Sequence, residues 1–365
     1  MTLDLNVGFW KKRKVLITGH TGFKGSWLSL WLQSLGADLF GYSLAPPTTP
    51  NLYQLAKISE GMESVHGDVR DLTQLKQAIA SHRPEILIHM AAQSLVRTSY
   101  NNPIETYETN VLGTANVLEA VRGNEETKVV LIVTSDKCYE NREWVWGYRE
   151  YDTLGGHDPY SSSKACAELV TAAYRSSFFN SPSTKGGHTA LASVRAGNVI
   201  GGGDWSVDRL VPDVMRAVIE NRPVVIRNPG SIRPWQHVLD PLAGYLLLSE
   251  KLFIEGKDFA ESWNFGPQQS DAKSVLWITQ QLAEMWSGKV RWNVDQNQNP
   301  HEAFSLRLDC SKASTRLGWQ PRWDINDALK ATVEWYAAYL AGQNIRDFTI
   351  QQISCYLSDR DKAAQ

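Results

Sequence analysis

Three glycines in the pattern Gly-x-x-Gly-x-x-Gly stand between two apolar segments near the start of the chain. The first segment, residues 15–18, is short and β-branched, and the second, residues 26–32, is a longer helical run. The glycines are Gly19, Gly22 and Gly25. Without a Cβ, such a turn can be tight and can approach a phosphate lying at the positive N-terminus of the following helix. The strand–turn–helix context therefore predicts a dinucleotide-binding loop.

The same alternation of short apolar runs and helical segments continues through the first half of the chain. Strands are expected at residues 15–18, 39–43, 65–69, 86–90, 129–133 and 190–194, and helices at 26–32, 72–80, 105–121 and from 160 onward, with a loop at 45–55. This order predicts an α/β fold with a Rossmann-type, doubly wound parallel sheet. We expect a nucleotide-binding domain at residues 1–195, with a returning segment near 233–267, and a smaller substrate-binding lobe at 196–365.

Polar side chains follow the buried strand at residues 129–133. Ser135, Asp136 and Lys137 emerge there, at the end of a strand, where an open α/β sheet binds its ligands. Tyr160 and Lys164 follow at the i and i+4 positions of one helix face. A neighbouring cation lowers the pKa of a phenol, so we expect Tyr160 to act as an acid or base at neutral pH.

Composition excludes several classes of protein. The 365 residues carry a formal net charge of −2, which gives no bulk field for nucleic acid or an anionic membrane. No apolar run is long enough to span a membrane, and the N-terminus lacks the apolar core of a secretory signal. The four cysteines lack the spacing of a metal site or of a disulfide framework. We therefore expect a cytoplasmic protein without a structural metal.

Several longer motifs together resemble the extended short-chain dehydrogenase/reductase family, and within it the CDP-D-glucose 4,6-dehydratases. The motifs are GHTGFKGSWL at 19–28, AAQSLVR at 91–97, NVLGT at 110–114 and TSDKCY at 134–139. The resemblance covers nearly the whole chain. It implies NAD as cofactor, a role in deoxysugar biosynthesis such as that of lipopolysaccharide O-antigens, and a homodimer or homotetramer. Family members pair through two helices, which here would span residues 105–121 and 160–178.

The resemblance also implies roles for individual residues. NAD would be held by Gly19, Thr21, Gly22, Phe23, Lys24, Gly25, Asp68, Val69, Ala91, Ala92, Gln93, Asn110, Tyr160 and Lys164, with Asp68 and Val69 beside the adenine and Lys164 on the nicotinamide ribose. The catalytic residues would be Ser135, Asp136, Lys137, Tyr160 and Lys164. Asn198 and Arg233 would bind the substrate diphosphate, for which a planar guanidinium is suited.

The implied reaction converts CDP-D-glucose to CDP-4-keto-6-deoxy-D-glucose and water. Tyr160 would take the C4 hydroxyl proton, Ser135 would hydrogen-bond the sugar oxygen, and Asp136 would protonate the departing C6 hydroxyl. Two alternatives stay open: a nucleotide-sugar 4-epimerase, which needs no acid at C6, and a non-catalytic dinucleotide sensor. Asp136 with Lys137 argues against the first, and Ser135, Tyr160 and Lys164 together argue against the second.

Two positions depart from common patterns. Lys137 stands where the dTDP-glucose 4,6-dehydratases have Glu, which leaves the base at C5 open. The second strand ends in Ser43 and Leu44, without the acid that would bind the adenosine ribose or an Arg for a 2′-phosphate. NAD is therefore favoured over NADP, and Lys24 is the residue that could instead contact a 2′-phosphate.

Overall fold

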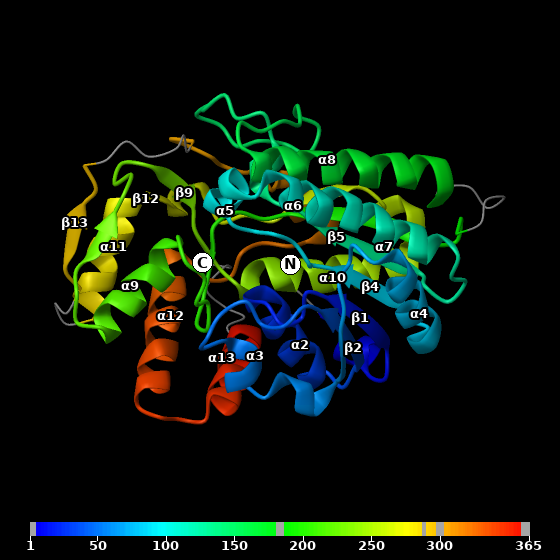
Figure 1. The fold of residues 1–365 in the computed structure, drawn as a ribbon, viewed down its shortest axis with the longest axis horizontal. Coiled ribbons are helices and arrows are strands. Elements are labelled where there is room, and N and C mark those ends of the chain that lie inside the picture. The colour runs from blue at the N-terminus through cyan, green and yellow to red at the C-terminus, as the bar shows by residue number, and fades with distance from the viewer. Residues whose placement is uncertain (1–4, 180–185, 287–289, 297–302, 359–365) are drawn as a thin grey trace.

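The computed structural model describes residues 5–179, 186–286, 290–296 and 303–358, and a seven-stranded sheet forms its centre (Figure 1). The strand order is β11-β6-β5-β4-β1-β2-β3, and every neighbouring pair is parallel. The strands are β1 (Lys14–Thr18), β2 (Asp38–Ser43), β3 (Glu63–His66), β4 (Ile86–His89), β5 (Val129–Val133), β6 (Ala190–Arg195) and β11 (Ser262–Asn264). The predicted α/β fold with a doubly wound parallel sheet is confirmed.

Helices cover both faces of the sheet. Successive strand residues point to opposite faces, so Val15 and Ile17 of β1 pack in one apolar cluster and Leu16 packs in the other. The first cluster includes side chains of α2 (Phe23–Ser34) and α10 (Leu239–Glu255), and the second includes those of α4 (Leu72–His82), α7 (Gly113–Arg122) and α8 (Pro159–Tyr174). Figure 1 shows the resulting three layers.

The second half of the chain extends beyond one end of the sheet and then returns to it (Figure 1). Its elements are β7 (Val199–Ile200), α9 (Leu210–Ile219), β8 (Val224–Ile226), β9 (Ile232–Pro234), β10 (Gln236–His237), β12 (Ala272–Ser274), α11 (Val275–Met285), β13 (Trp292–Val294), α12 (Ile325–Leu340) and α13 (Ile345–Ser358). β11 pairs with β6, which brings residues 262–264 to the edge of the central sheet. The returning segment near residues 233–267 stays a prediction. The two-domain boundary stays a prediction, and its outer ends, residues 1–4 and 359–365, lie outside the described residues.

Three predicted elements differ in detail. The strand expected at residues 65–69 is β3, which begins two residues earlier and ends at His66; Gly67, which follows it, lies against the Tyr42 ring. The loop expected at 45–55 ends in a short helix, α3 (Leu52–Leu55), which Asn51 caps. The helix expected at 105–121 is built from α6 (Pro103–Tyr107), a π-helical turn (Glu108–Leu112) and α7. The short helices α1 (Val7–Trp10) and α5 (Val96–Asn101) were not expected.

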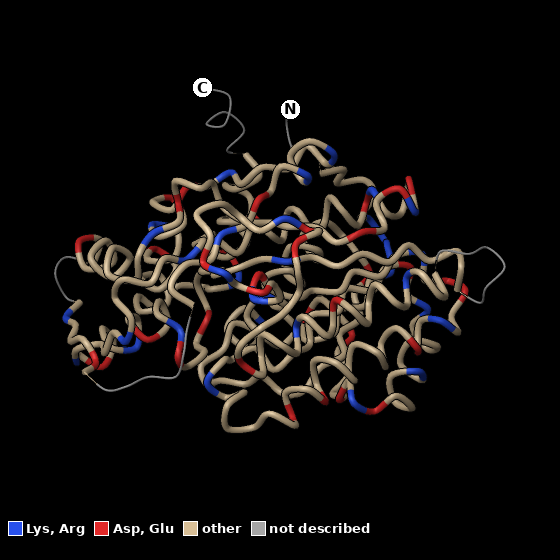
Figure 2. Tube along the Cα trace, turned by 90° about the horizontal axis from the view of Figure 1, so that it is seen from above, with Lys and Arg blue, Asp and Glu red and all other residues tan. Residues whose placement is uncertain are grey.

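Charges of both signs are interspersed along the described chain, as Figure 2 shows. None of the described helices is long and apolar enough to cross a membrane. Among the described residues, no group of three or more His, Cys, Asp and Glu side chains is arranged to hold a metal ion.

Candidate active site

A cavity of about 520 Å³ lies at the carboxyl ends of the central strands, between the sheet and the elements that follow β6. It brings together the predicted site residues Gly19, Thr21, Gly22, Phe23, Lys24, Gly25, Asp68, Val69, Ala91, Ala92, Ser135, Asp136, Lys137, Tyr160, Lys164, Asn198 and Arg233. Gln93 and Asn110 do not line it. Ligands of open α/β sheets bind in this position.

The glycine loop is shaped so that two of its positions exclude any side chain. Gly19 has φ +76°, and a Cβ there would lie 2.6 Å from the backbone nitrogen of Ala91. A Cβ on Gly25 would lie 2.2 Å from the carbonyl oxygen of Gly19. α2 begins directly after Gly22, so its N-terminal N–H groups face the cavity's edge. This loop fits a dinucleotide pyrophosphate, the group for which such a turn and helix N-terminus are suited.

Hydroxyl groups hold the glycine loop against the end of β2. Thr21 Oγ1 lies 2.8 Å from Ser43 Oγ and donates to the carbonyl oxygen of Leu44 at 2.9 Å. Asp68 pairs with Arg70 at 2.6 Å, and this hydrogen-bonded pair lowers the pKa of the carboxyl. The end of β2 therefore offers hydroxyl and backbone groups, as the sequence indicated.

Asn110 supports the site from the π-helical turn rather than from the cavity wall. Its Oδ1 accepts from the Gln93 backbone N–H at 2.9 Å, and its Nδ2 donates to the Gln93 carbonyl oxygen and to Ser163 Oγ, each at 2.9 Å. The turn thus fastens the loop after β4 to α8. π-Helical turns are rare and are often found at functional sites. This one lies between α6 and α7 in a continuous helical stretch, so the sequence predicted a single helix there.

The end of β5 holds Ser135 and Asp136 close together. Ser135 Oγ donates to Asp136 Oδ1 at 3.0 Å and accepts from the Lys137 backbone N–H at 3.2 Å. Asp136 Oδ2 is buried and has no hydrogen-bond partner among the described residues. Burial raises the pKa of Asp136, and the charges of Lys137 and Arg233 only partly oppose this effect. A carboxyl in this environment can hold a proton and donate it to a bound substrate.

Tyr160 and Lys164 lie on the cavity face of α8, as predicted. Asp158 caps the helix, and Lys164 Nζ donates to the carbonyl oxygen of Val133 at 3.2 Å. The expected lowering of the phenol pKa is wrong for this structure, because burial raises the pKa of Tyr160 to about 12. Burial also lowers the pKa of Lys164 to about 8. The spacing predicted the shared face but not how deeply that face is buried.

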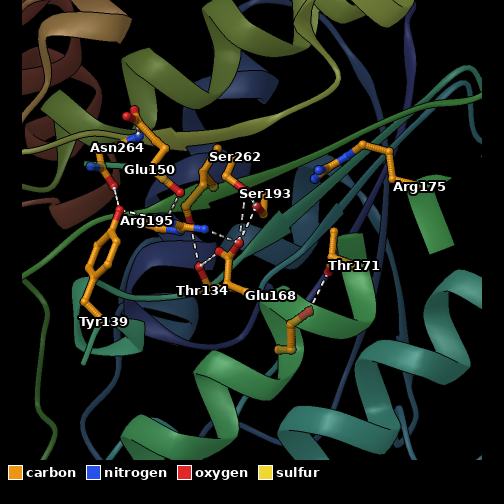
Figure 3. A network of polar contacts seen from close by, with 12 residues as sticks. Thr134, Tyr139, Glu150, Glu168, Thr171, Arg175, Ser193, Arg195, Ser262 and Asn264 are labelled. Carbon is orange, nitrogen blue, oxygen red and sulfur yellow. Dashed lines mark hydrogen bonds and ion pairs between the residues drawn. The ribbon is translucent and has the colours of Figure 1, made fainter. Parts of the chain in front are cut away.

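A buried ion pair that sequence reasoning missed lies beneath this site (Figure 3). Glu168 and Arg195 are 2.7 Å apart, and their side chains are 1% and 2% exposed. Glu168 also accepts from Thr134 Oγ1 at 2.5 Å and from Ser193 Oγ at 2.7 Å. One carboxylate thus joins α8 to β5 and β6. The sequence feature that could have revealed this pair is Glu168 itself, an acid four residues after Lys164 on the same helix face.

Basic side chains line the opposite wall of the cavity. Arg233 donates to the carbonyl oxygens of Ile232 and Phe304, at 3.0 and 3.2 Å. Arg209, which the sequence did not single out, pairs with Asp204 at 2.9 Å and donates to Ser94 Oγ at 3.0 Å. Arg97, Arg227 and the predicted Asn198 also line this wall. Such a wall suits a substrate that carries phosphate groups.

Lys24 does not extend toward the end of β2. Its Nζ donates to the Tyr245 hydroxyl at 3.2 Å, on α10. Burial lowers the pKa of Lys24 to about 7, and the charges of Lys164 and Arg209 add to this effect. Lys24 therefore faces the end of the cavity that contains Asp136, and the idea that it contacts a 2′-phosphate beside Ser43 finds no support in this geometry.

Comparison with known proteins gives a consistent family assignment. A family model described as GDP-mannose 4,6 dehydratase matches residues 16–332. A CDP-glucose 4,6-dehydratase of Salmonella typhimurium is 52% identical over 97% of this chain and 99% of its own length.

Solved structures with the same fold include two nucleotide-sugar enzymes. A dTDP-glucose 4,6-dehydratase from Bacillus anthracis in complex with NAD has a TM-score of 0.74 at 22% identity, covering 91% of this chain and 98% of its own. A UDP-glucose 4-epimerase from Thermotoga maritima with UDP-glucose has a TM-score of 0.77 at 21% identity, covering 89% and 99%.

Proposed function

We propose, because the chain belongs to the GDP-mannose 4,6-dehydratase family of extended short-chain dehydrogenases/reductases, that it converts CDP-D-glucose to CDP-4-keto-6-deoxy-D-glucose and water with NAD as cofactor. The observation that carries the proposal is Asp136. This buried carboxyl has a raised pKa, and its Oδ2 has no hydrogen-bond partner in the part of the chain that the structure describes. It would supply the acid that a dehydratase needs at C6. An epimerase has no use for that acid. The 52% identity to a CDP-glucose 4,6-dehydratase supports CDP-D-glucose as the substrate.

The residues of the glycine loop would hold the NAD pyrophosphate, and Lys164 would hold the nicotinamide ribose. The two positions that exclude a Cβ support this assignment, since they allow the tight turn that brings the loop and the N-terminus of α2 together. When bound, NAD supplies the oxidant for C4 and the reductant for C6. The hydroxyl groups at the end of β2 support NAD over NADP, which titration of the protein with both cofactors tests. Tighter binding of NADP would reverse this preference.

The chain's own residues move protons and orient the sugar. Tyr160 would accept the proton of the C4 hydroxyl as C4 is oxidised, and Ser135 would hydrogen-bond the sugar oxygen. Asp136 would protonate the C6 hydroxyl as it departs. A positioned acid or base of this kind contributes on the order of 10² to 10⁴ in rate. Arg233 and Asn198 would bind the diphosphate, and the other arginines of that wall support the same role.

Lys137 would serve the proton at C5, which becomes acidic once C4 is a ketone. It lies beside Asp136 at the end of β5 and lines the cavity. As a neutral amine it would take the C5 proton, and as an ammonium it would stabilise the developing enolate. Both roles require Lys137 to act after C4 oxidation.

Incubation with CDP-, dTDP-, GDP- and UDP-hexoses, followed by mass spectrometry, tests the function. We expect loss of one water from CDP-D-glucose and retention of a C4 deuterium label at C6. A product of unchanged mass with inverted C4 would indicate an epimerase. No reaction with any nucleotide sugar, despite bound NAD, would indicate a dinucleotide sensor.

We further propose that the chain forms a homodimer, or a homotetramer built from such dimers. Apolar side chains are exposed on the helices that the family resemblance implicates: Ile104 of α6, Leu112 of the π-helical turn and Leu169 of α8 are 69%, 58% and 58% exposed. Sedimentation of Leu169→Glu beside the unchanged protein tests this pairing. All four cysteines are free thiols, which supports a reducing compartment such as the cytoplasm.

A further inference from the structure

Gly197 follows β6 beside the strand end that carries Asp136. β5 and β6 are parallel neighbours, and Val133 of the first strand pairs with Val194 of the second. Asp136 and Gly197 each lie three positions further along their own chain segment, so the same register brings them side by side. Gly197 is buried. The loop after β6 therefore forms a wall against the Asp136 carboxyl.

The Asp136 carboxyl occupies the space that a side chain at position 197 would need. A Cβ built on Gly197 would lie 1.9 Å from Asp136 Oδ2, 2.4 Å from its Cγ and 3.1 Å from its Oδ1. These are the three nearest heavy atoms, and Cβ atoms in proteins do not approach other atoms within 3.0 Å. The backbone of Gly197 has no positive φ that would itself require glycine. What excludes a side chain here is thus the carboxyl of Asp136 and not the backbone conformation.

Hydrogen bonds hold the backbone side of this contact in place. The Gly197 carbonyl oxygen accepts from Gln236 Nε2 at 3.1 Å, and the same Nε2 donates to the Phe265 carbonyl oxygen at 2.9 Å. The carboxyl is held less firmly, because Ser135 Oγ donates to Oδ1 at 3.0 Å, whereas Oδ2 has no hydrogen-bond partner among the described residues. Oδ2 is also the oxygen nearest to position 197. A methyl group at this position would therefore displace the carboxyl, which can rotate about χ1, rather than the backbone.

We propose, resting on the proposed function, that Gly197 positions Asp136 as the acid for the C6 hydroxyl by leaving open the space that the carboxyl fills. Gly197 has no side chain that could contact the substrate, so it is a positioning residue. The step that it serves is elimination: the C5–H and C6–O bonds break, the C5–C6 double bond forms, and the proton of Asp136 leaves with the hydroxyl as water.

A displaced Asp136 carboxyl should separate the two halves of the reaction. Oxidation at C4 depends on Tyr160 of α8 and not on the space beside Gly197. Departure of the C6 hydroxyl depends on where the carboxyl lies, and a misplacement of about 1 Å can cost on the order of 10² in rate. We expect Gly197→Ala to lose water at least about 10²-fold more slowly than the unchanged protein and to oxidise C4 within about tenfold of its rate.

Single-turnover reaction of the NAD-loaded protein with CDP-D-glucose measures both steps. The absorbance of bound NADH reports C4 oxidation, and mass spectrometry of the nucleotide sugar reports loss of water. In Gly197→Ala we expect NADH to accumulate before water is lost. Gly230→Ala is the matched control, because a Cβ there would lie 3.6 Å from the Phe304 ring, which is an ordinary contact. This control should dehydrate the substrate as the unchanged protein does.

Combining Gly197→Ala with Asp136→Ala separates positioning from a general structural role. Without the carboxyl atoms the space beside position 197 is empty. The second substitution should therefore add nothing to the effects of Asp136→Ala on folding, on NAD binding and on the residual rate of water loss. Such non-additivity is expected when one residue acts through another with which it is in contact.

Water loss in Gly197→Ala as fast as in Gly230→Ala would overturn the proposal. So would equal slowing of oxidation and water loss, or a further loss in the double variant, because position 197 would then act otherwise than through the Asp136 carboxyl. If Gly197→Ala does not fold, the double variant decides: its folding supports the proposal, and its failure to fold overturns it. Failure of the unchanged protein to release water from CDP-D-glucose would instead refute the proposed function.

Discussion

Replacing Glu168 by Gln should destabilise the fold strongly, because it leaves Arg195 as a buried charge without its counter-ion. The two side chains are 2.7 Å apart and almost fully buried. Gln is nearly isosteric, and its carbonyl oxygen can still accept from Thr134 or Ser193. The variant therefore removes the charge pair while keeping the packing and some of the hydrogen bonds (Figure 3).

Two estimates of the loss agree. Removing one partner of a buried pair typically costs about 3–5 kcal/mol. Burial alone would raise the pKa of Glu168, but the charge and hydrogen bonds of Arg195 and the neighbouring hydroxyls lower it to about 2, against an ordinary value of 4.5. That difference corresponds to about 3 kcal/mol of stability near pH 7. We expect urea denaturation to give a loss of about 3 kcal/mol in the free energy of unfolding.

The direction of the Glu168 pKa shift predicts how the loss of unfolding free energy depends on pH. Because the folded-state pKa lies below the unfolded value, the contribution of Glu168 is complete above about pH 4.5 and is lost as the pH falls toward about 2. The difference in the free energy of unfolding between Glu168→Gln and the unchanged protein should therefore become smaller in acid. Glu119→Gln, which breaks a partly exposed pair with Arg122 on α7, is the control and should cost no more than about 1 kcal/mol. A loss for Glu168→Gln no larger than for this control would refute the reasoning.

Three further predictions concern the cavity. Tyr160→Phe should slow C4 oxidation by about 10²- to 10⁴-fold while substrate titration stays nearly unchanged, and full activity would remove Tyr160 from the mechanism. Gly25→Ala should weaken NAD binding at least about tenfold in a cofactor titration, because its Cβ would overlap the carbonyl oxygen of Gly19, whereas Gly123→Ala, with nothing within 4 Å, should bind NAD normally. Lys137→Met should oxidise C4 and then stall with NADH bound, without incorporating deuterium at C5 in D₂O; normal turnover with normal C5 labelling would exclude both roles of Lys137.

The sheet and most of its helices could be predicted because their signals are local. Apolar runs of four to six residues next to helical segments leave little alternative to a parallel, doubly wound sheet, and a strand must end where its apolar run ends. β3 was predicted to run to residue 69, but it pairs with β2 only over residues 63–66. The register of that pairing is not contained in any local pattern of the sequence.

Much of the candidate site was also visible, for a similar reason. Residues that end adjacent parallel strands converge at one edge, so Gly19, the loop after β4 and Ser135 could be placed together without coordinates. Arg209 and Lys24 could not be assigned in this way. Arg209 reaches the cavity from a loop before α9, and Lys24 is directed by its contact with Tyr245, more than two hundred residues away in the chain.

The spacing of residues in the sequence could not predict the protonation state of Tyr160, because that state depends on burial. The separation of Tyr160 and Lys164 determines that both lie on one helix face, and on an exposed helix the cation would prevail. Here the face is buried, and the cost of a desolvated phenolate exceeds the help of the Arg209 charge, since the pKa of Tyr160 rises to about 12.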